Sequence, residues 1–218
     1  MHKLQTWGGI AALINGFAYI IGIGMVLTLL APFLAASQAE KISFLLEHQT
    51  LMALWYFIIY LVAGVWMVPL ALGLHDRMQQ VAPNLMRVAT AMGIIWATTI
   101  LSSGMLLINN LKIIADLQQS DPTQTSAVWV AISAIASGLG GAIELPGGVW
   151  VSLISLAGLQ TKRLPKLLNY CGLLVGATGI ATVFPVFYEA GSIFGVGMIG
   201  WFLWVGVVLV RTKNIGKV

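Results

Sequence analysis

The chain has 218 residues, of which 59% are apolar and only 8% charged, and its formal net charge is +4. An ordinary soluble domain has about 25% charged residues, so this composition excludes a water-soluble globular protein. Its basic residues lie in short segments beside apolar stretches, where they act as topology signals rather than as a nucleic-acid surface. We therefore predict an integral membrane protein with no nucleic-acid partner.

Six stretches of the chain are long and apolar enough to cross a bilayer, which takes about 20 residues for about 30 Å of hydrocarbon. The first exceeds the apolar core of about 7–15 residues in a cleavable signal peptide, so we expect it to be retained. The predicted fold is an all-α transmembrane bundle in one domain, residues 1–218. Its predicted spans are residues 7–34, 51–74, 88–108, 127–159, 167–187 and 193–210.

The lysines and arginines between these stretches predict the orientation. With the N-terminus in the cytoplasm, only Lys41 and Lys112 fall outside. An excess of basic residues on the cytoplasmic side is the usual topology signal, and it predicts that both termini are cytoplasmic. The nine predicted inner residues are Lys3, Arg77, Arg87, Lys162, Arg163, Lys166, Arg211, Lys213 and Lys217.

The fourth stretch differs from the others in its length and in its centre. Its 33 residues would make about 50 Å of helix, too long for one straight crossing. Division into two spans would reverse the charge bias of the loops that follow. Pro146 cannot donate to the carbonyl of Ala142. We predict one crossing that is kinked or broken near Gly141–Gly148, at the helix-breaking residues Gly140, Gly141, Pro146, Gly147 and Gly148.

Glu144 lies in the middle of this stretch, where a carboxylate costs about 2.5–3.5 kcal/mol on insertion scales. No lysine or arginine lies within a predicted span to pair with it. One interpretation is a proton or small-molecule site at a broken helix, as in transporters. The other is a protonated Glu144 that ties helices together by a hydrogen bond, or a position nearer the outer surface. The predicted polar partners are Asn15, Ser102 and Ser137, with Thr98, Thr99 and Ser103 as further candidates.

Other chemistry finds little support in the residue pattern. The three histidines lie near the ends of predicted spans, so no pair is placed to hold a haem between helices. No cluster of cysteine and histidine predicts a zinc site, and the single Cys171 allows no intrachain disulfide. We predict no metal, no cofactor and no catalytic residue.

Three sequence stretches carry a resemblance to a known family. They are residues 84–104 (NLMRVATAMGIIWATTILSSG), 138–150 (GLGGAIELPGGVW) and 164–185 (LPKLLNYCGLLVGATGIATVFP). The chain resembles a family of bacterial multipass membrane proteins defined as a domain of unknown function, and the resemblance covers most of its length. It implies the bacterial inner membrane and no particular activity. The family motif is matched by Gly140, Gly141, Glu144, Gly147 and Gly148.

The sequence leaves two principal functions open. The first is a non-enzymatic bundle that binds, transports or senses a small molecule or a proton around Glu144. The alternative is a non-catalytic accessory subunit of a larger membrane complex, which the many small packing residues favour. A membrane enzyme comes third, because Glu144 has no cluster of catalytic groups around it. The predicted partners are the lipid bilayer and either another membrane protein or a second copy of the chain.

Overall fold

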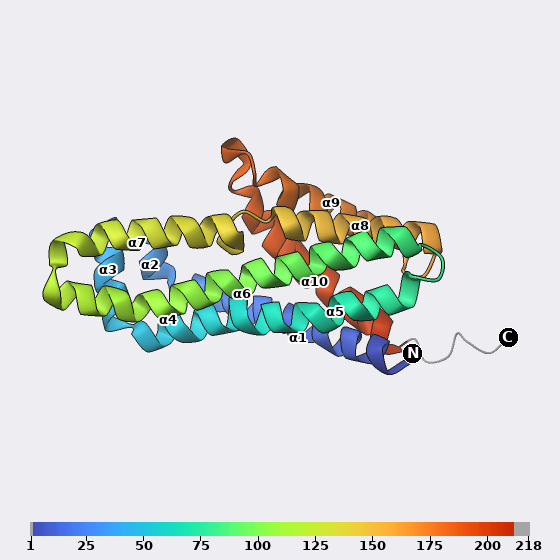
Figure 1. The fold of residues 1–218 in the computed structure, drawn as a ribbon, viewed down its shortest axis with the longest axis horizontal. Helices are drawn as coiled ribbons and strands as arrows, with labels where there is room; N and C mark the ends of the chain where they lie inside the picture. Colours follow the sequence, from blue (N-terminus) through green and yellow to red (C-terminus); the bar gives the residue numbers. More distant parts are fainter. Residues whose placement is uncertain (1, 212–218) are drawn as a thin grey trace.

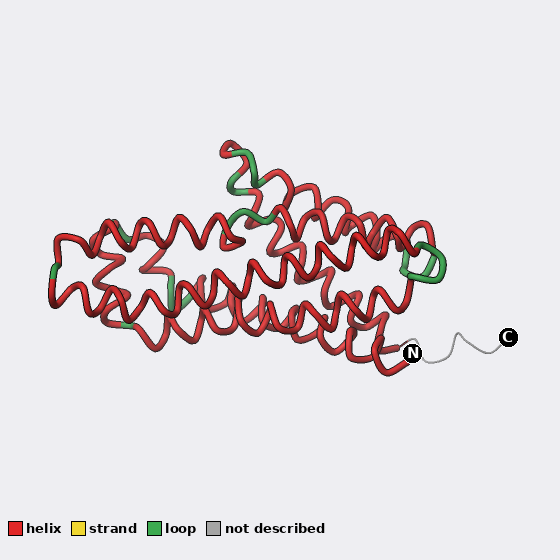
Figure 2. Tube along the Cα trace, viewed as in Figure 1, coloured by secondary structure: helices red, strands yellow, loops and turns green. Residues whose placement is uncertain are grey.

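The computed structural model describes residues 2–211, and every regular element in that range is helical. Most of the helices run along one long axis and form an elongated bundle with short connections (Figures 1 and 2). The predicted all-α class is therefore confirmed for the described residues. Within them, the helical segments long and apolar enough to cross a membrane are Lys3–Leu27, Gln49–Met78, Pro83–Ser120, Pro122–Thr161 and Ala190–Arg211.

The first helix is shorter than the first apolar stretch. Helix α1 (His2–Leu27) ends seven residues before position 34, and the short helices α2 (Ala31–Ala35) and α3 (Gln38–Glu47) follow. A capping box begins α3, in which the backbone N–H of Ser37 donates to the Glu40 carboxylate at 2.7 Å. Side-chain and backbone hydrogen bonds from Ser37 hold the pKa of Glu40 below its ordinary value.

The second long segment contains a change of helix type. It consists of α4 (Gln49–Tyr56), the π-helical η1 (Phe57–Val62) and α5 (Ala63–Met78). A π-helical turn holds one residue more than an α-helical turn, and such turns are frequent at functional sites. The hydropathy of residues 51–74 is continuous through this region, so the apolar pattern does not predict the π-helix.

Helices α6 and α7 form a long antiparallel pair. Helix α6 (Pro83–Ser120) has 38 residues, which is about 57 Å, and α7 (Pro122–Ala136) returns beside it. A proline begins each helix, at a position where the missing N–H would have no partner in any case. Asp121 in the turn accepts hydrogen bonds from Thr123 and Gln124, which lower the pKa of its carboxyl group.

The last helices make a hairpin that is shorter than the rest of the bundle. After α8 (Leu145–Thr161), α9 (Lys166–Ala181) has 16 residues, or about 24 Å. This length is below the roughly 30 Å of a crossing. The predicted stretch 167–187 is α-helical only as far as Ala181, and its apolar remainder forms a turn and the short η3 (Pro185–Phe187). Helix α10 (Ala190–Arg211) then runs back along the bundle.

One end of the bundle gathers the connections that carry the predicted cytoplasmic cations. The start of α1, the α5–α6 and α8–α9 connections and the end of α10 all lie there (Figure 1), and we call it the basic end. The Arg77 guanidinium joins two of these connections by donating to the Arg163 carbonyl at 2.9 and 2.7 Å. Two further predicted cytoplasmic cations, Lys213 and Lys217, lie outside the described residues.

Glycines bring the helices close together at more than one height in the bundle. A Cβ atom added to Gly73 on α5 would lie 2.8 Å from the Cα of Gly8 on α1, and one added to Gly148 on α8 would lie 2.6 Å from the Gly176 carbonyl on α9. Close approach at small residues is the usual way in which membrane helices pack. Between these contacts lies a buried aromatic core made by Trp96, Trp150, Phe194, Trp201 and Phe202.

Candidate functional site

An interruption between α7 and α8 positions Glu144. Helix α7 continues into the π-helical η2 (Ser137–Gly141), in which Gly140 has a φ of 122°, a conformation that favours glycine. The amides of Ala142 and Ile143 both donate to the Ser137 carbonyl at 3.2 Å. Residues 142–144 are not helical, and α8 begins after Glu144, whose carbonyl accepts from the Gly148 amide.

The residues that the sequence marks as helix breakers have different parts in this geometry. Gly140 and Gly141 end the π-helical turn. Pro146 lies in the first turn of α8, where the lack of an N–H costs no hydrogen bond, so it begins a new helix. Gly147 and Gly148 lie within α8 and allow close contact, with Trp96 on α6 and with Gly176 on α9 respectively.

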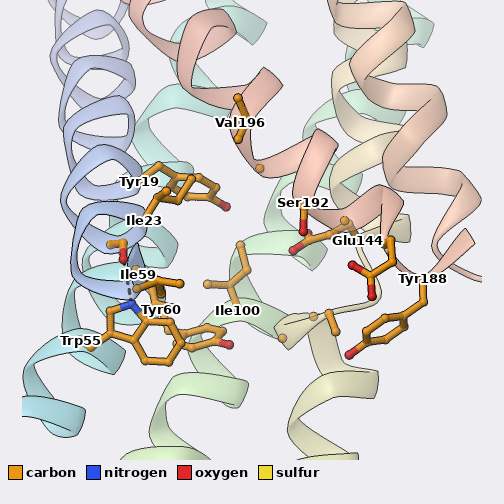
Figure 3. Close-up of a pocket in the computed structure, with 18 of the residues that line it drawn as sticks. Tyr19, Ile23, Trp55, Ile59, Tyr60, Ile100, Glu144, Tyr188, Ser192 and Val196 are labelled. Carbon is orange, nitrogen blue, oxygen red and sulfur yellow. Dashed lines mark hydrogen bonds between the residues drawn. The ribbon is translucent and has the colours of Figure 1, made fainter. Parts of the chain in front are cut away.

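A cavity of about 550 Å³ lies beside the interruption. Its walls come from α1, η1, the η2–α8 connection and the start of α10, which surround it in Figure 3. Most of the lining is apolar, as in the pockets that bind small molecules. The polar lining side chains outside the indole of Trp55 are Tyr19, Tyr60, Glu144, Tyr188, Glu189 and Ser192.

Glu144 has a fixed backbone and one buried carboxyl oxygen for which the described residues supply no hydrogen bond. Its backbone N–H donates to Thr182 Oγ1 at 2.9 Å, and the Thr182 hydroxyl donates to the Gly179 carbonyl at 2.7 Å, so α9 holds the main chain. The carboxyl oxygen Oε2 is buried and has no hydrogen-bond partner. The indole of Trp96 lies beside the carboxyl group, but its Nε1 also has no partner. A buried, unpaired carboxyl oxygen is costly, so this site is prepared for a partner that the chain does not supply.

Aromatic side chains surround the other walls of the cavity. Tyr60 is only 9% exposed, and its hydroxyl has no hydrogen-bond partner among the described residues. Tyr60 and Tyr19 are both close enough to Glu144 to interact with its charge. Trp55 is held in place because its Nε1 donates to the Gly22 carbonyl at 3.1 Å. Figure 3 shows these rings opposite Glu144 and Tyr188.

The predicted polar partners of Glu144 do not line the cavity. Asn15 on α1 is fully buried, and both of its amide atoms lack a partner. Ser137 uses its carbonyl to end η2, and Ser102 is half-buried on α6. None of these three side chains has a hydrogen bond to Glu144 in the described part of the chain, so their part in a site stays a prediction. Of the predicted site residues, Glu144, Gly140 and Gly141 line the cavity.

The other predicted partners of Glu144 also form their hydrogen bonds with other groups. Ser103 Oγ donates to the Ala136 carbonyl at 3.0 Å, which joins α6 to α7. The hydroxyls of Thr98 and Thr99 donate to carbonyls of their own helix, as Ser and Thr side chains often do. These three hydroxyl groups are therefore satisfied without help from Glu144.

Sequence reasoning missed the aromatic residues of the cavity, although one signal places them at a common depth. Tyr19 lies 16 residues after Lys3, Tyr60 lies 17 residues before Arg77, and Glu144 lies 18 residues before Lys162. Each residue of a helix advances about 1.5 Å, so equal distances from the basic loops mean similar heights in the bundle. The pattern indicates height but not the face of each helix, which only the packed structure shows.

Comparison with family models, with curated proteins and with solved structures finds no match. The resemblance to a bacterial membrane family therefore stays a prediction. The class of protein is defined by the fold itself, which is all-helical over residues 2–211, with several helices long and apolar enough to cross a membrane. Among the described residues, no group of three or more His, Cys, Asp and Glu side chains could hold a metal ion.

Proposed function

We propose that the protein crosses the bacterial inner membrane six times and has both termini in the cytoplasm. The excess of basic residues in alternate connections supports this orientation. The α9–α10 hairpin would supply the fifth and sixth crossings, with the apolar residues 182–187 after the short α9 completing the fifth. The exposed fractions there are 60% for Phe184, 81% for Val186 and 55% for Phe187, and lipid would cover them.

We further propose that the protein binds a small molecule or a proton at Glu144, as a transporter or a sensor. The observation that carries this proposal is a buried carboxyl oxygen without a partner on a cavity of about 550 Å³. Pockets of about 300–1,000 Å³ are the usual size for drug-sized ligands. Ionisable groups at membrane depth are costly and commonly belong to substrate or proton pathways.

The alternative structural part for Glu144 has less support. A tie between helices needs a hydrogen bond from the side chain to another helix, and the bond that joins Glu144 to α9 is made by its backbone. The indole of Trp96 on α6 lies beside the carboxyl group, but among the described residues its Nε1 makes no hydrogen bond of normal geometry, so a ligand could compete for this carboxyl group.

Native mass spectrometry of protein extracted gently from its own membrane tests the binding function. We expect a bound mass in the wild-type protein that is lost in Glu144→Gln, a variant that keeps the size of the side chain. Glu47→Gln changes an exposed acid on α3 and should keep the mass. A folded Glu144→Gln protein with the same bound mass and the same pH response would contradict the proposal.

The accessory-subunit function is favoured by one observation on α7. Only 17% of the most apolar stretch in Pro122–Thr161 is buried, against 39% or more in the other long segments. A partner membrane protein on α7 would cover this surface. The same mass spectra test the idea, because a second polypeptide in fixed ratio supports it and a protein alone in every spectrum contradicts it.

A further inference from the structure

The cavity has an excess of negative charge. Glu144 and Glu189 both line it, and no lysine, arginine or histidine of the described residues does. Glu144 precedes α8 and Glu189 precedes α10, and the N-terminus of a helix carries about half a positive charge. When both carboxyl groups are ionised, the two helix ends leave a net charge of about −1. This balance suits one monovalent cation and disfavours an anion.

The aromatic lining points to the kind of cation. Trp55, Tyr19, Tyr60 and Tyr188 come from four parts of the chain and share the walls of one cavity. Aromatic rings attract ammonium groups through their faces, and cages of such rings bind quaternary ammonium ligands. A quaternary ammonium head has no N–H group to donate a hydrogen bond, so it needs only a negative charge nearby. The carboxyl group of Glu144 can supply that charge.

The α1–α10 pair gives the cavity a lateral opening. Toward the basic end the two helices are in close contact, since a Cβ atom on Gly9 would lie 3.0 Å from the Gly206 carbonyl. The rings of Tyr19 and Phe202 end this contact, with centroids 5.8 Å apart. Beyond Tyr19 the helices separate, and both then line the cavity (Figure 3).

The walls of this opening are apolar and continue onto the surface. Leu27 on α1 and Val196 on α10 both line the cavity, yet 71% and 60% of these side chains are exposed. A Cβ atom added to Gly195, the residue before Val196 on α10, would meet nothing within 4 Å. An apolar chain can therefore lie in the opening while a polar head reaches Glu144.

We infer that the cavity binds an amphipathic organic cation, with its ammonium head among the aromatic rings beside Glu144 and its apolar tail in the opening between α1 and α10. This inference rests on the proposed binding function and names the class of ligand. By the proposed orientation, the ligand enters from the outer leaflet.

Binding of radiolabelled dodecyltrimethylammonium to the full chain in an uncharged maltoside detergent tests the ligand class. We expect saturable binding that dodecyl sulfate does not displace, and weaker binding of tetramethylammonium, which has no tail. Glu144→Gln should weaken binding about tenfold or more. Tyr60→Phe keeps the ring and should bind normally, whereas Tyr60→Leu should bind about 2- to 30-fold more weakly. Equal losses for the two Tyr60 variants would overturn the aromatic part of the inference.

The opening is tested by the rate of binding. Gly195→Trp should slow association of the labelled cation, because the added indole would fill part of the opening. Ile20→Trp is the matched control, because Ile20 is an exposed residue of α1 that does not line the cavity. Equal association rates of the labelled cation for Gly195→Trp and Ile20→Trp would overturn entry through the opening between α1 and α10.

The ligand class and the binding function can fail separately. A native bound mass that is an anion or a neutral lipid, and that Glu144→Gln removes, would overturn the cation inference and leave the proposed binding function in place. A protein that carries no native mass and does not bind the labelled cation would contradict both.

Discussion

Glycine has opposite surroundings in two regions of the bundle. Near the basic end, Gly8 and Gly73 face each other, and a Cβ atom on either would collide with the backbone of the other. On the α10 wall of the cavity, a Cβ atom added to Gly195 would meet nothing within 4 Å, as at Gly24 on α1, although one added to the lining residue Gly22 would collide with Ile59. Glycine thus lets helices touch in one region and leaves open space in the other. A high glycine content therefore does not by itself indicate tight packing.

The two regions also differ in whether they contribute mainly to stability or to binding. Away from the cavity lining, Trp150, Trp201 and Phe202 are buried between closely packed helices, and such cores hold most of the stability of a bundle. The cavity end depends on a few single bonds, among them Trp55 to Gly22 and Glu144 to Thr182. Changes at the cavity end should alter binding more than folding, and changes at the basic end should do the reverse.

The largest expected effect is at the glycine contact between α1 and α5. Gly73→Ala places a methyl group against the backbone of α1, and we expect the free energy of unfolding to fall by about 1–3 kcal/mol. Thermal unfolding in detergent measures the change. Gly24→Ala is the matched control and should be neutral or stabilising, since Gly in a helix is about 1 kcal/mol less favourable than Ala. Similar unfolding temperatures for the two variants would remove the contrast between the ends.

The second expected effect is a gain of stability rather than a loss. Glu144→Leu removes a buried carboxyl oxygen that has no partner, so we expect the empty protein to gain about 1–3 kcal/mol of stability. The same variant should lose the native bound mass, as expected where a site carries function at the expense of stability. Unfolding curves in detergent, beside those of Glu47→Gln, provide the comparison. A clear loss of stability would mean that Glu144 is paired and structural.

A smaller effect is expected where one hydrogen bond joins the walls of the cavity. Trp55→Phe removes the 3.1 Å bond from the indole to the Gly22 carbonyl, which should cost about 0.5–1.5 kcal/mol. Trp204→Phe is a suitable control, because 38% of Trp204 is exposed and no hydrogen bond of its indole is seen. If Trp55→Phe and Trp204→Phe shifted the unfolding temperature equally, the hydrogen bond to Gly22 would make no separate contribution to stability.

The smallest effect concerns α3, near the cavity end of the bundle. The pKa of Glu40 is lowered by its hydrogen bonds from Ser37, so this carboxylate stabilises the fold at pH values above its unfolded pKa. That contribution is lost as the pH falls through the lower pKa of the folded state. The difference in unfolding temperature between the wild-type protein and Glu40→Gln should therefore shrink at acid pH. A difference that is constant with pH would argue against the capping box.

The sequence predicts the all-helical class well because apolar length is a local signal. Pro146 and the glycines around Glu144 also mark a place where a helix is weakened, and residues 142–144 there are not helical. It places the end of α9 poorly: residues 182–187 are as apolar as the helix before them, and only the turn before Pro185 marks the change.

The cavity could not be predicted, for a physical reason. Its walls join Tyr19, Tyr60, Glu144 and Tyr188, which lie far apart in the chain and meet only when the helices pack in one rotation about their axes. A uniformly apolar membrane helix carries no amphipathic stripe to show that rotation. Asn15 shows the same difficulty, because it is buried in α1 as expected for a polar group in a span, but it lies outside the cavity lining.

The π-helical segment η1 acts as an inserted residue in the second long helix. Each residue of an α-helix turns the chain by about 100°, so an extra residue in one turn rotates everything before it relative to everything after it. Removal of one residue between Phe57 and Val62 would restore an α-helix and turn α4 by about 100° against α5. The indole of Trp55 would then point away from Gly22, and the cavity would lose a wall although α5 kept all of its contacts. The aromatic lining thus depends on the length of the chain at this position as much as on the identity of the residues.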